Sequence, residues 1–274
     1  MIGKRVSHYD VLRTLGSGGM GVVYEAEDTQ LGRRVALKFL PKELSSDTQA
    51  LERFQREARA ASSLNHPNIC TVHAIGQHEG EHFITMELLE GESLAQVLTK
   101  RKFEIGELVD AAVQIADALE SAHAKGIVHR DIKPANLFLN TRGQVKILDF
   151  GLAKFEAVPA GTDPAAADTA SGLGDLTTPG TAMGTVAYMS PEQARGHLTD
   201  ARSDLFSLGT VLYQMAAGVL PFRGDTQTMV FDAILNRDPV PIRQLHRSVP
   251  EAFDRILVKL LEKDRALRAR APPS

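Results

Sequence analysis

The chain has 274 residues, 43% of them hydrophobic and 24% charged, which is the composition of an ordinary soluble globular protein. Its formal net charge of −3 gives no electrostatic reason to expect nucleic acid or an anionic membrane surface as the main partner. The single cysteine, Cys70, excludes an internal disulfide, favours a reducing, cytoplasmic location and lies in an apolar run where a buried thiol is expected. We expect no signal peptide and no membrane segment, because the most apolar stretch, 206–222, is short and contains polar and glycine positions.

The first part of the chain predicts a small β-rich lobe. Runs of β-branched and aromatic residues indicate strands at 22–27, 34–40, 71–75 and 82–89. Between the second and third of these runs, apolar positions spaced three and four apart predict an amphipathic helix over 45–64. Pro67 closes this helix, because proline disfavours helical geometry in the residue before it.

The pattern changes near Glu90, after which helices dominate. Amphipathic periodicity predicts helices over 94–98 and 107–124, and helical patterns return from 190 onward. Short strands are expected around Leu137 and over 145–148.

One segment, 156–182, is rich in Ala, Gly, Thr and Pro, has few large apolar side chains and predicts a long loop. The fold class is therefore α+β with two lobes. The expected boundaries are an N-terminal extension over 1–8, a β-rich lobe over 9–89 and a larger, mainly helical lobe over 90–274.

The first chemical motif is the glycine-rich segment at 16–23. Glycines allow sharp turns and let backbone N–H groups approach phosphate oxygens closely. A dinucleotide-binding turn has a similar glycine spacing, but it requires a helix directly after the loop. Here a predicted strand follows, so the segment indicates a phosphate-binding loop between two strands.

Lys38 lies inside the short apolar strand predicted at 34–40. Most lysines in strands simply extend to solvent. Beside a phosphate-binding loop, a strand lysine can instead bind the α- and β-phosphates of a nucleotide when a glutamate holds it in place. Glu57, in the middle of the helix predicted over 45–64, is the candidate for that glutamate.

Residues 129–136 carry the strongest pattern. Asp131 offers a carboxylate that can position an acceptor hydroxyl and take its proton. Lys133 offers a cation for charge on a transferring phosphoryl group, and Asn136 offers an amide oxygen for a hard Mg²⁺ ion. Taken alone, this run could equally be a surface turn.

Asp149-Phe150-Gly151 directly follows the strand predicted at 145–148. A carboxylate at the exit of a strand is well placed to ligate Mg²⁺ that bridges nucleotide phosphates, and the glycine lets the chain turn away. The tripeptide by itself would usually be a turn. In order with the glycine-rich loop, Lys38 and the 129–136 segment, it indicates a site for phosphoryl transfer.

Over residues 9–268 the chain resembles a bacterial Ser/Thr protein kinase of the eukaryotic-like type. The resemblance implies the two-lobed kinase fold, ATP as phosphate donor, Mg²⁺ or Mn²⁺ as cofactor and protein Ser/Thr hydroxyls as acceptors. It assigns catalysis to Asp131 and Lys133 and metal binding to Asn136 and Asp149. The residues it assigns to ATP binding are Leu15, Gly16, Ser17, Gly18, Gly19, Met20, Gly21, Val22, Val23, Ala36, Lys38, Glu57, Met86, Glu87, Leu89 and Phe138.

The same resemblance implies a substrate class and two structural anchors. Lys133, two positions after the catalytic carboxylate, and the later Gly184-Thr185 pair follow the Ser/Thr-specific pattern. Glu192 is expected to pair with Arg268, and Asp204 is expected to anchor the backbone of the 129–136 segment.

Arg130, which precedes the catalytic carboxylate, implies activation by phosphorylation of the loop after residue 151. The candidate autophosphorylation sites are Thr177, Thr178 and Thr181, and a homodimer is the expected arrangement for phosphorylation between two copies. A flexible loop rich in threonine offers several such positions without any regulatory role.

Two features depart from the kinase pattern. The chain stops at Ser274, where kinases of this type continue into a final helix, and Arg265 stands where proline is common. The alternative is therefore an ATP-binding pseudokinase or scaffold module that a shortened helical lobe leaves inactive. Retention of Lys38, Asp131 and Asp149 argues against the pseudokinase form of this alternative.

Overall fold

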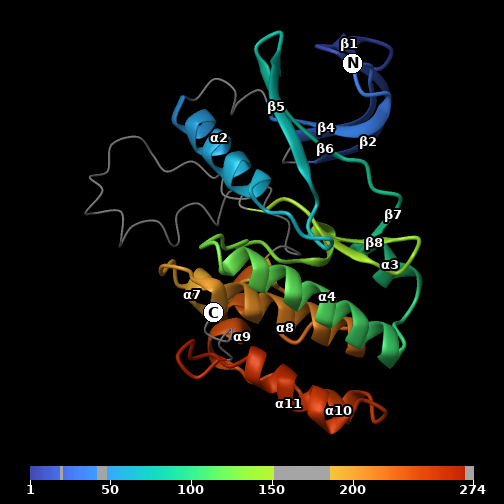
Figure 1. Ribbon diagram of the computed structural model, residues 1–274. Helices are drawn as coiled ribbons and strands as arrows, with labels where there is room; N and C mark the ends of the chain where they lie inside the picture. Colours follow the sequence, from blue (N-terminus) through green and yellow to red (C-terminus); the bar gives the residue numbers. More distant parts are fainter. Residues whose placement is uncertain (19–20, 42–47, 151–185, 269–274) are drawn as a thin grey trace.

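The computed structural model describes residues 1–18, 21–41, 48–150 and 186–268, which form a β-rich lobe above a helical lobe (Figure 1). The side chain of Glu57 is also not described, although its backbone is. Predictions outside these ranges concern Gly19, Met20, Gly151, the loop at 156–182, Thr177, Thr178, Thr181, Gly184 and Thr185.

The β-rich lobe is built on one six-stranded sheet. Its strands are β1 (Arg5–Val6), β2 (Tyr9–Gly18), β3 (Gly21–Asp28), β4 (Arg33–Phe39), β5 (Val72–His78) and β6 (Glu81–Glu87). They are ordered β1-β2-β3-β4-β6-β5, and all neighbours pair antiparallel. The strands expected from the sequence over 22–27 and 34–40 are confirmed as β3 and β4.

Residues expected to form an N-terminal extension contribute a strand to this sheet. Val6 pairs with Tyr9 across β1 and β2 and is fully buried. It packs in one apolar cluster with Val35, Leu37 and Phe83. A two-residue edge strand is short, but burial of its valine explains why the chain pairs there.

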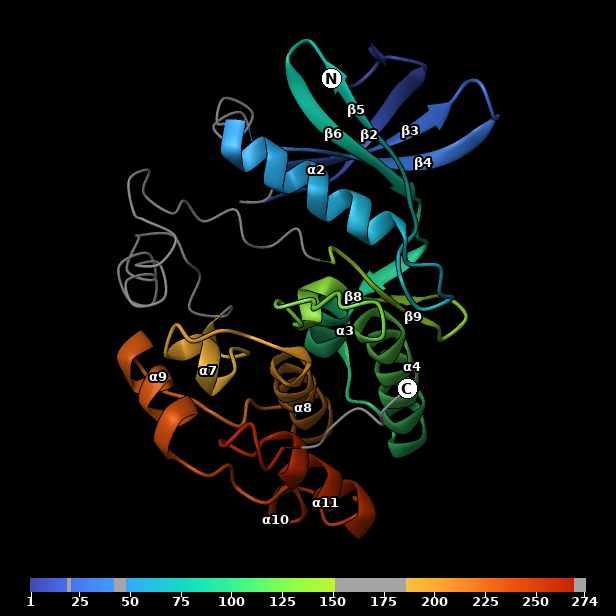
Figure 2. The same cartoon turned by 60° about the vertical axis from the view of Figure 1, so that its left-hand side comes forward.

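Helix α2 (Thr48–Ser62) packs against this sheet through the apolar face that its spacing predicts. Phe54 and Ala58 are buried and cluster with Ile84 of β6 and with Leu40. The two views in Figures 1 and 2 show the helix lying beside β5.

The second lobe is mainly helical, as predicted from Glu90 onward. Its helices are α3 (Leu94–Lys100), α4 (Ile105–His123), α7 (Pro191–Ala194), α8 (Ala201–Ala217), α9 (Gln227–Asn236), α10 (Ile242–Leu245) and α11 (Glu251–Leu260). A small antiparallel sheet orders β7 (Gly91–Ser93), β8 (Leu137–Asn140) and β9 (Val145–Ile147), with the 3₁₀ turn η1 (Pro134–Asn136) before β8.

Helices α4 and α8 form the centre of this lobe, and they lie side by side in both ribbon views (Figures 1 and 2). Ile115 and Leu119 of α4 and Phe206 and Leu212 of α8 are buried in one continuous apolar core. Helix α8 starts where the Asp200 side chain accepts from the backbone N–H of Arg202, and it ends at a glycine in the left-handed region. The central helix is thus buried along most of its length and capped at both ends.

The segment after α2 ties the two lobes together. Asn68 donates to the Val145 carbonyl oxygen and to the Gln114 side chain, each at 2.8 Å. The next residues pair with β9, since the Cys70 N–H donates to the Ile147 carbonyl oxygen at 2.9 Å. Burial, together with the nearby carboxylates of Glu87 and Asp149, raises the pKa of the Cys70 thiol, which agrees with the buried, unreactive thiol expected from the sequence.

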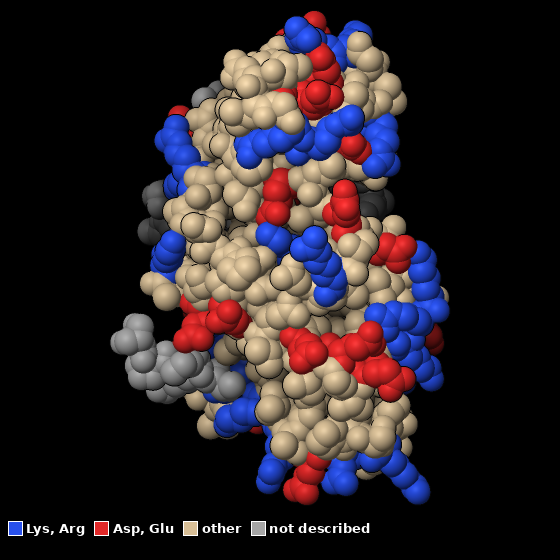
Figure 3. Space-filling view, turned by 45° about the vertical axis from the view of Figure 1, so that its right-hand side comes forward, with Lys and Arg blue, Asp and Glu red and all other residues tan. Residues whose placement is uncertain are grey.

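The molecular surface carries both signs of charge in both lobes, as the face in Figure 3 shows. On the six-stranded sheet, the Glu25 carboxylate accepts hydrogen bonds from Arg13 and Arg34, and the Arg33 side chain lies 3.7 Å from the Asp28 carboxylate. Basic side chains therefore stand beside acidic ones on this sheet.

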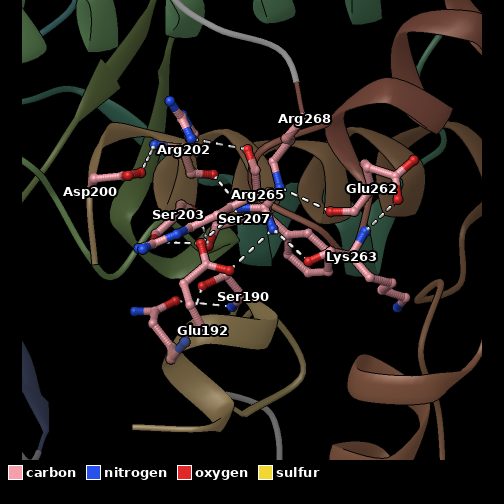
Figure 4. A network of polar contacts seen from close by, with 12 residues as sticks. Ser190, Glu192, Asp200, Arg202, Ser203, Ser207, Glu262, Lys263, Arg265 and Arg268 are labelled. Atoms are coloured by element: carbon pink, nitrogen blue, oxygen red, sulfur yellow. Dashed lines mark hydrogen bonds and ion pairs between the residues drawn. The ribbon is translucent and has the colours of Figure 1, made fainter. Parts of the chain in front are cut away.

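A buried ion pair fastens α7 to the end of the described chain (Figure 4). Two nitrogens of Arg268 donate to the two carboxylate oxygens of Glu192 at 2.8 and 3.1 Å, and the side chains are 0% and 5% exposed. Ser203 of α8 donates to the same carboxylate at 2.7 Å. The pair predicted between Glu192 and Arg268 is confirmed, and it joins α7, α8 and the segment after α11.

The environment of Glu192 stabilises its ionised form. Burial raises the pKa of this carboxyl, but hydrogen bonds from Arg268 and Ser203 together lower it more, so its pKa lies below the ordinary value. A carboxyl with a lowered folded-state pKa stabilises the fold at pH values above its unfolded pKa of about 4.3. That stabilisation is lost as the pH falls through the lowered, folded-state pKa.

Replacing Arg268 with methionine leaves the buried Glu192 carboxylate without its cation, so we expect the free energy of unfolding to fall by about 3–5 kcal/mol. Urea unfolding at pH 7, followed by circular dichroism, measures the change. Arg255→Met is the matched control, because Arg255 is 73% exposed and lies 3.7 Å from Glu251 on the surface of α11. An exposed pair of this kind contributes about 0.3–0.5 kcal/mol, so equal losses in both variants would contradict the structural role of the buried pair.

Candidate active site

Two side chains of the 129–136 loop, those of Lys133 and Asn136, contact the carboxylate of Asp131 in the same loop. Lys133 Nζ lies 2.7 Å from Asp131 Oδ2. Asn136 Nδ2 donates to the same Oδ2 and to the Asp131 carbonyl oxygen, both at 2.8 Å. The turn η1 brings Asn136 back toward Asp131, so residues that are five apart in sequence share one cluster. Within the described part of the chain, both side chains contact Oδ2 rather than Oδ1.

Asp204, in the first turn of α8, anchors the backbone of this loop. Its carboxylate accepts from the N–H groups of His129 and Arg130 at 2.8 and 2.7 Å, and His123 Nε2 of α4 lies 2.7 Å from it. The Asp204 side chain is 1% exposed. A carboxylate this deeply buried is stable only with such partners, so the anchoring role predicted for Asp204 is confirmed.

His129 links the 129–136 loop to the strand that carries Asp149. Its Nε2 lies 2.7 Å from the Leu148 carbonyl oxygen, and its Nδ1 accepts from the Asp131 N–H at 3.2 Å. These partners assign the proton to Nε2, because a carbonyl oxygen can only accept. The ring also packs edge-on against Phe150, with centroids 4.7 Å apart. Sequence reasoning assigned no role to His129, although it begins the strongest motif.

Lys38 pairs with Asp149, a contact that joins the two lobes. Lys38 Nζ of β4 lies 2.7 Å from Asp149 Oδ2, and the side chains are 11% and 15% exposed. The predicted partner of Lys38, Glu57, lies on α2, but its side chain is outside the described part of the chain. The strand lysine and the carboxylate predicted to bind metal are thus brought together directly.

Two residues beside these groups have unusual backbone geometry. Arg130 and Asp149 have φ values of +67° and +57°, in the left-handed region that residues other than glycine rarely adopt. Such conformations cost of order 1–3 kcal/mol each and persist only where the surroundings hold them. Here the strained positions coincide with the residues that flank and carry the predicted chemistry.

The predicted glycine-rich loop is a hairpin between β2 and β3. Gly16 faces Val23, Ser17 faces Val22 and Gly18 faces Gly21 across the two strands. Leu15, at the start of this hairpin, is 40% exposed. Gly21 has a φ of +105°, and a Cβ atom there would lie 1.8 Å from the Phe39 carbonyl oxygen, so only glycine fits.

Among the other residues assigned to ATP binding, Val23, Ala36 and Met86 lie on the six-stranded sheet, and Phe138 lies on β8 of the helical lobe. Val23 faces Lys38, and Ala36 faces Met86, in the registers of β3–β4 and β4–β6. Ala36 is buried, and Met86, Leu89 and Phe138 are partly buried.

The Glu87 carboxylate makes contacts that the sequence did not indicate. Lys146 Nζ and the Thr71 N–H both lie 2.7 Å from its Oε1. The resemblance assigned Glu87 to ATP binding and named no partner for its carboxylate. The one available signal was the position of Lys146 between the buried Val145 and Ile147 of β9, which directs a lysine to the opposite face.

The hairpin between β2 and β3 belongs to one lobe, and the cluster of Asp131, Lys133 and Asn136 belongs to the other. The chain matches the family model described as protein kinase domain over residues 9–272, and it belongs to this family. Its curated relatives are named serine/threonine-protein kinases.

Three curated relatives illustrate the similarity. The chain is 42% identical over 258 residues to serine/threonine-protein kinase PknA of Mycobacterium tuberculosis, covering 92% of this chain and 56% of that protein. It is 40% identical over 276 residues to serine/threonine-protein kinase pkn3 of Myxococcus xanthus, covering 97% and 48%. It is 37% identical over 266 residues to serine/threonine-protein kinase PrkC of Bacillus subtilis, covering 96% and 39%. The chain thus spans between 39% and 56% of the length of these relatives.

A solved structure gives the same fold. The crystal structure of the Mycobacterium tuberculosis PknI kinase domain is 26% identical to this chain, with a TM-score of 0.71. The match covers 98% of this chain and 94% of that one. The two-lobed α+β fold expected from the sequence is confirmed.

Gly21→Ala forces a Cβ atom against the Phe39 carbonyl oxygen in an already left-handed backbone. We expect it to lower the free energy of unfolding of the nucleotide-free protein by about 1–3 kcal/mol. Gly16→Ala in the same hairpin is the control, because a Cβ there meets nothing within 4 Å, and it should stay within about 0.5 kcal/mol of the parent. Thermal unfolding measures both, and equal stability of the two variants would show that the close approach at Gly21 does not constrain the hairpin.

Proposed function

We propose that this chain transfers the γ-phosphate of ATP to Ser or Thr hydroxyls of protein substrates. The observation that carries the proposal is the cluster at Asp131, where Lys133 and Asn136 hold one carboxylate oxygen at 2.7 and 2.8 Å. Family membership and the names of the relatives support it. The acceptor class rests on Lys133, the position that the Ser/Thr pattern requires.

The proposed chemistry uses the two oxygens of Asp131 differently. Oδ2 is held by Lys133 and Asn136, so Oδ1 accepts a hydrogen bond from the acceptor hydroxyl and orients it. The hydroxyl oxygen attacks the γ-phosphorus, the bond to the β-phosphate oxygen breaks, ADP leaves and the hydroxyl proton passes to Asp131. Lys133 offsets negative charge on the transferring group.

The donor set fits Mg²⁺ bound with ATP. Asn136 uses its amide nitrogen for both of its contacts with Asp131, which leaves the hard amide oxygen for a cation. Asp149 supplies a carboxylate, and one or two protein oxygens suffice when phosphates complete the coordination. The metal would neutralise phosphate charge. Lys38, now paired with Asp149, would then bind the phosphates, with Glu57 as its second partner.

We further propose roles for the remaining predicted residues. The hairpin from Leu15 to Val23 would cover the phosphates, and Val23, Ala36 and Phe138 would enclose adenine. Met86 would border the back of the pocket. The Glu87 and Leu89 backbones would bond the adenine edge.

The alternative is an ATP-binding scaffold without transferase activity. The Glu192–Arg268 pair and the Asp204 anchor, which hold α7 and the 129–136 loop, are both formed, and this supports the active kinase over the scaffold. The alternative predicts stable nucleotide binding with no Asp131-dependent transfer.

Location and assembly complete the proposal. Use of ATP and the single buried thiol suit a cytoplasmic site of action, and a transient homodimer would allow phosphorylation of one copy by another. Among residues 1–18, 21–41, 48–150 and 186–268, no helix has the length and apolar character required to cross a bilayer.

Asp131→Asn keeps the shape of the side chain but removes the proton acceptor, so we expect kcat to fall by about 10²–10⁴-fold with little change in the KM for ATP. A radiometric assay with a generic Ser/Thr protein substrate and Mg²⁺–ATP measures it. Asp117→Asn, an exposed change on α4, should leave kcat unchanged. Equal transfer by the parent and Asp131→Asn would exclude the proposed function.

Autophosphorylation at Thr177, Thr178 or Thr181 would place a phosphate near Arg130 and order the activation loop. Phosphopeptide mapping after incubation with ATP should find phosphate on this cluster. Replacing the three threonines with valine should lower activity toward a substrate by about 10-fold, the effect of about 1.4 kcal/mol in loop ordering. Thr162→Val with Thr169→Val, in the same segment, is the control. Phosphate found only outside the cluster would refute the assignment.

A further inference from the structure

One side chain connects α7 to the 129–136 loop. Gln193 is the third residue of α7, directly after the Glu192 of the buried ion pair. Its Oε1 accepts from the Ser190 N–H at 2.9 Å, and its Nε2 donates to the Arg130 carbonyl oxygen at 2.7 Å. Residues 63 positions apart in sequence are thereby joined by one amide group.

The partners of Gln193 fix the orientation of its amide. A backbone N–H can only donate and a carbonyl oxygen can only accept, so exchanging the two amide atoms would lose both bonds. The residues next to Gln193 in the chain are held firmly in place. Ser190 is 0% exposed, and Glu192 is held by Arg268 and Ser203, as Figure 4 shows.

Gln193 bonds to Arg130, which has a strained backbone and directly precedes Asp131. Arg130 has a φ of +67°, and its N–H is already held by Asp204 at 2.7 Å. Gln193 holds its carbonyl group, so the backbone of Arg130 is fixed on both sides. The Arg130 carbonyl group and the Asp131 N–H belong to the same planar peptide unit, so this bond helps to fix the direction in which the chain enters Asp131.

We propose that Gln193 is a positioning residue for Asp131: by holding the Arg130 carbonyl group, it sets the direction of the catalytic carboxylate. The proposal rests on the kinase activity proposed above.

A simpler role for Gln193 is to cap α7, and the chain contains a reference for that role. Ser93 and Gln96 form the same capping box on α3, with the same distances of 2.9 and 3.3 Å as Ser190 and Gln193. Gln96 is exposed, and the described hydrogen bonds of its side chain stay within its own capping box. A change that affects capping alone should therefore act equally at both positions.

Gln193→Glu tests this bond, because glutamate keeps the capping acceptor but presents an oxygen instead of a donor to the Arg130 carbonyl. We expect kcat to fall by about 10- to 100-fold, with the KM for ATP and the urea midpoint matching those of Gln96→Glu. Gln193→Lys restores a donor without the capping acceptor, and it should recover most of the lost kcat.

Hydrogen exchange provides a readout that does not depend on catalysis. In the nucleotide-free protein, peptides covering 127–133 should exchange faster in Gln193→Glu than in the parent or Gln96→Glu. Unchanged kcat and exchange in Gln193→Glu would overturn the proposal, as would equal losses in Gln193→Glu and Gln193→Lys. A parent protein without Asp131-dependent transfer would instead refute the proposed function, while the exchange experiment would still decide whether the bond from Gln193 holds the loop.

Discussion

A single buried carboxylate organises the centre of this molecule. Asp204 is nearly inaccessible to water, and it is stable there because two backbone N–H groups of the 129–136 loop and a histidine of α4 surround it. The interaction works in both directions. The loop satisfies the buried charge, and the charge forces the loop backbone at Arg130 into a conformation that it would otherwise avoid. The catalytic cluster at Asp131 is built on that fixed backbone.

Helix α8 carries the side chains that anchor the neighbouring segments. Asp204 reaches the catalytic loop, Ser203 reaches Glu192 on α7, and Ser207 donates to the Tyr188 carbonyl oxygen at 2.8 Å. Three polar side chains within two turns of one buried helix therefore hold both the 129–136 loop and the segment from Tyr188 to Glu192. Because α8 is packed along its length against the apolar core, these anchors move little relative to one another.

The charged groups at the proposed site are paired with one another. Lys38 pairs with Asp149 across the lobes, and Lys133 pairs with Asp131 within the loop. A partly buried charge is costly when it is alone, so mutual pairing keeps the site stable without ligand. Nucleotide and metal would replace the first pair by a phosphate–lysine contact and a metal–carboxylate contact, while the second pair stays with the acceptor hydroxyl.

Sequence alone determined the local structure and the chemical inventory. The periodicity of Phe54 and Ala58 predicted α2, and the β-branched runs predicted β3 and β4, because side-chain alternation is a local property. Asp131, Lys133 and Asn136 were predictable together because one short turn connects them. Resemblance to a family added the Glu192–Arg268 and Asp204 anchors, which periodicity cannot reveal.

Only the tertiary structure decided which distant groups meet. Lys38 and Asp149 are 111 residues apart, and no local pattern encodes their 2.7 Å contact. The same holds for His129 with the Leu148 carbonyl and for Gln193 with Arg130, where a side chain finds a backbone group that every residue possesses. Backbone acceptors carry no sequence signature, so their partners emerge only when the packing of α7, α8 and the loop brings them within bonding distance.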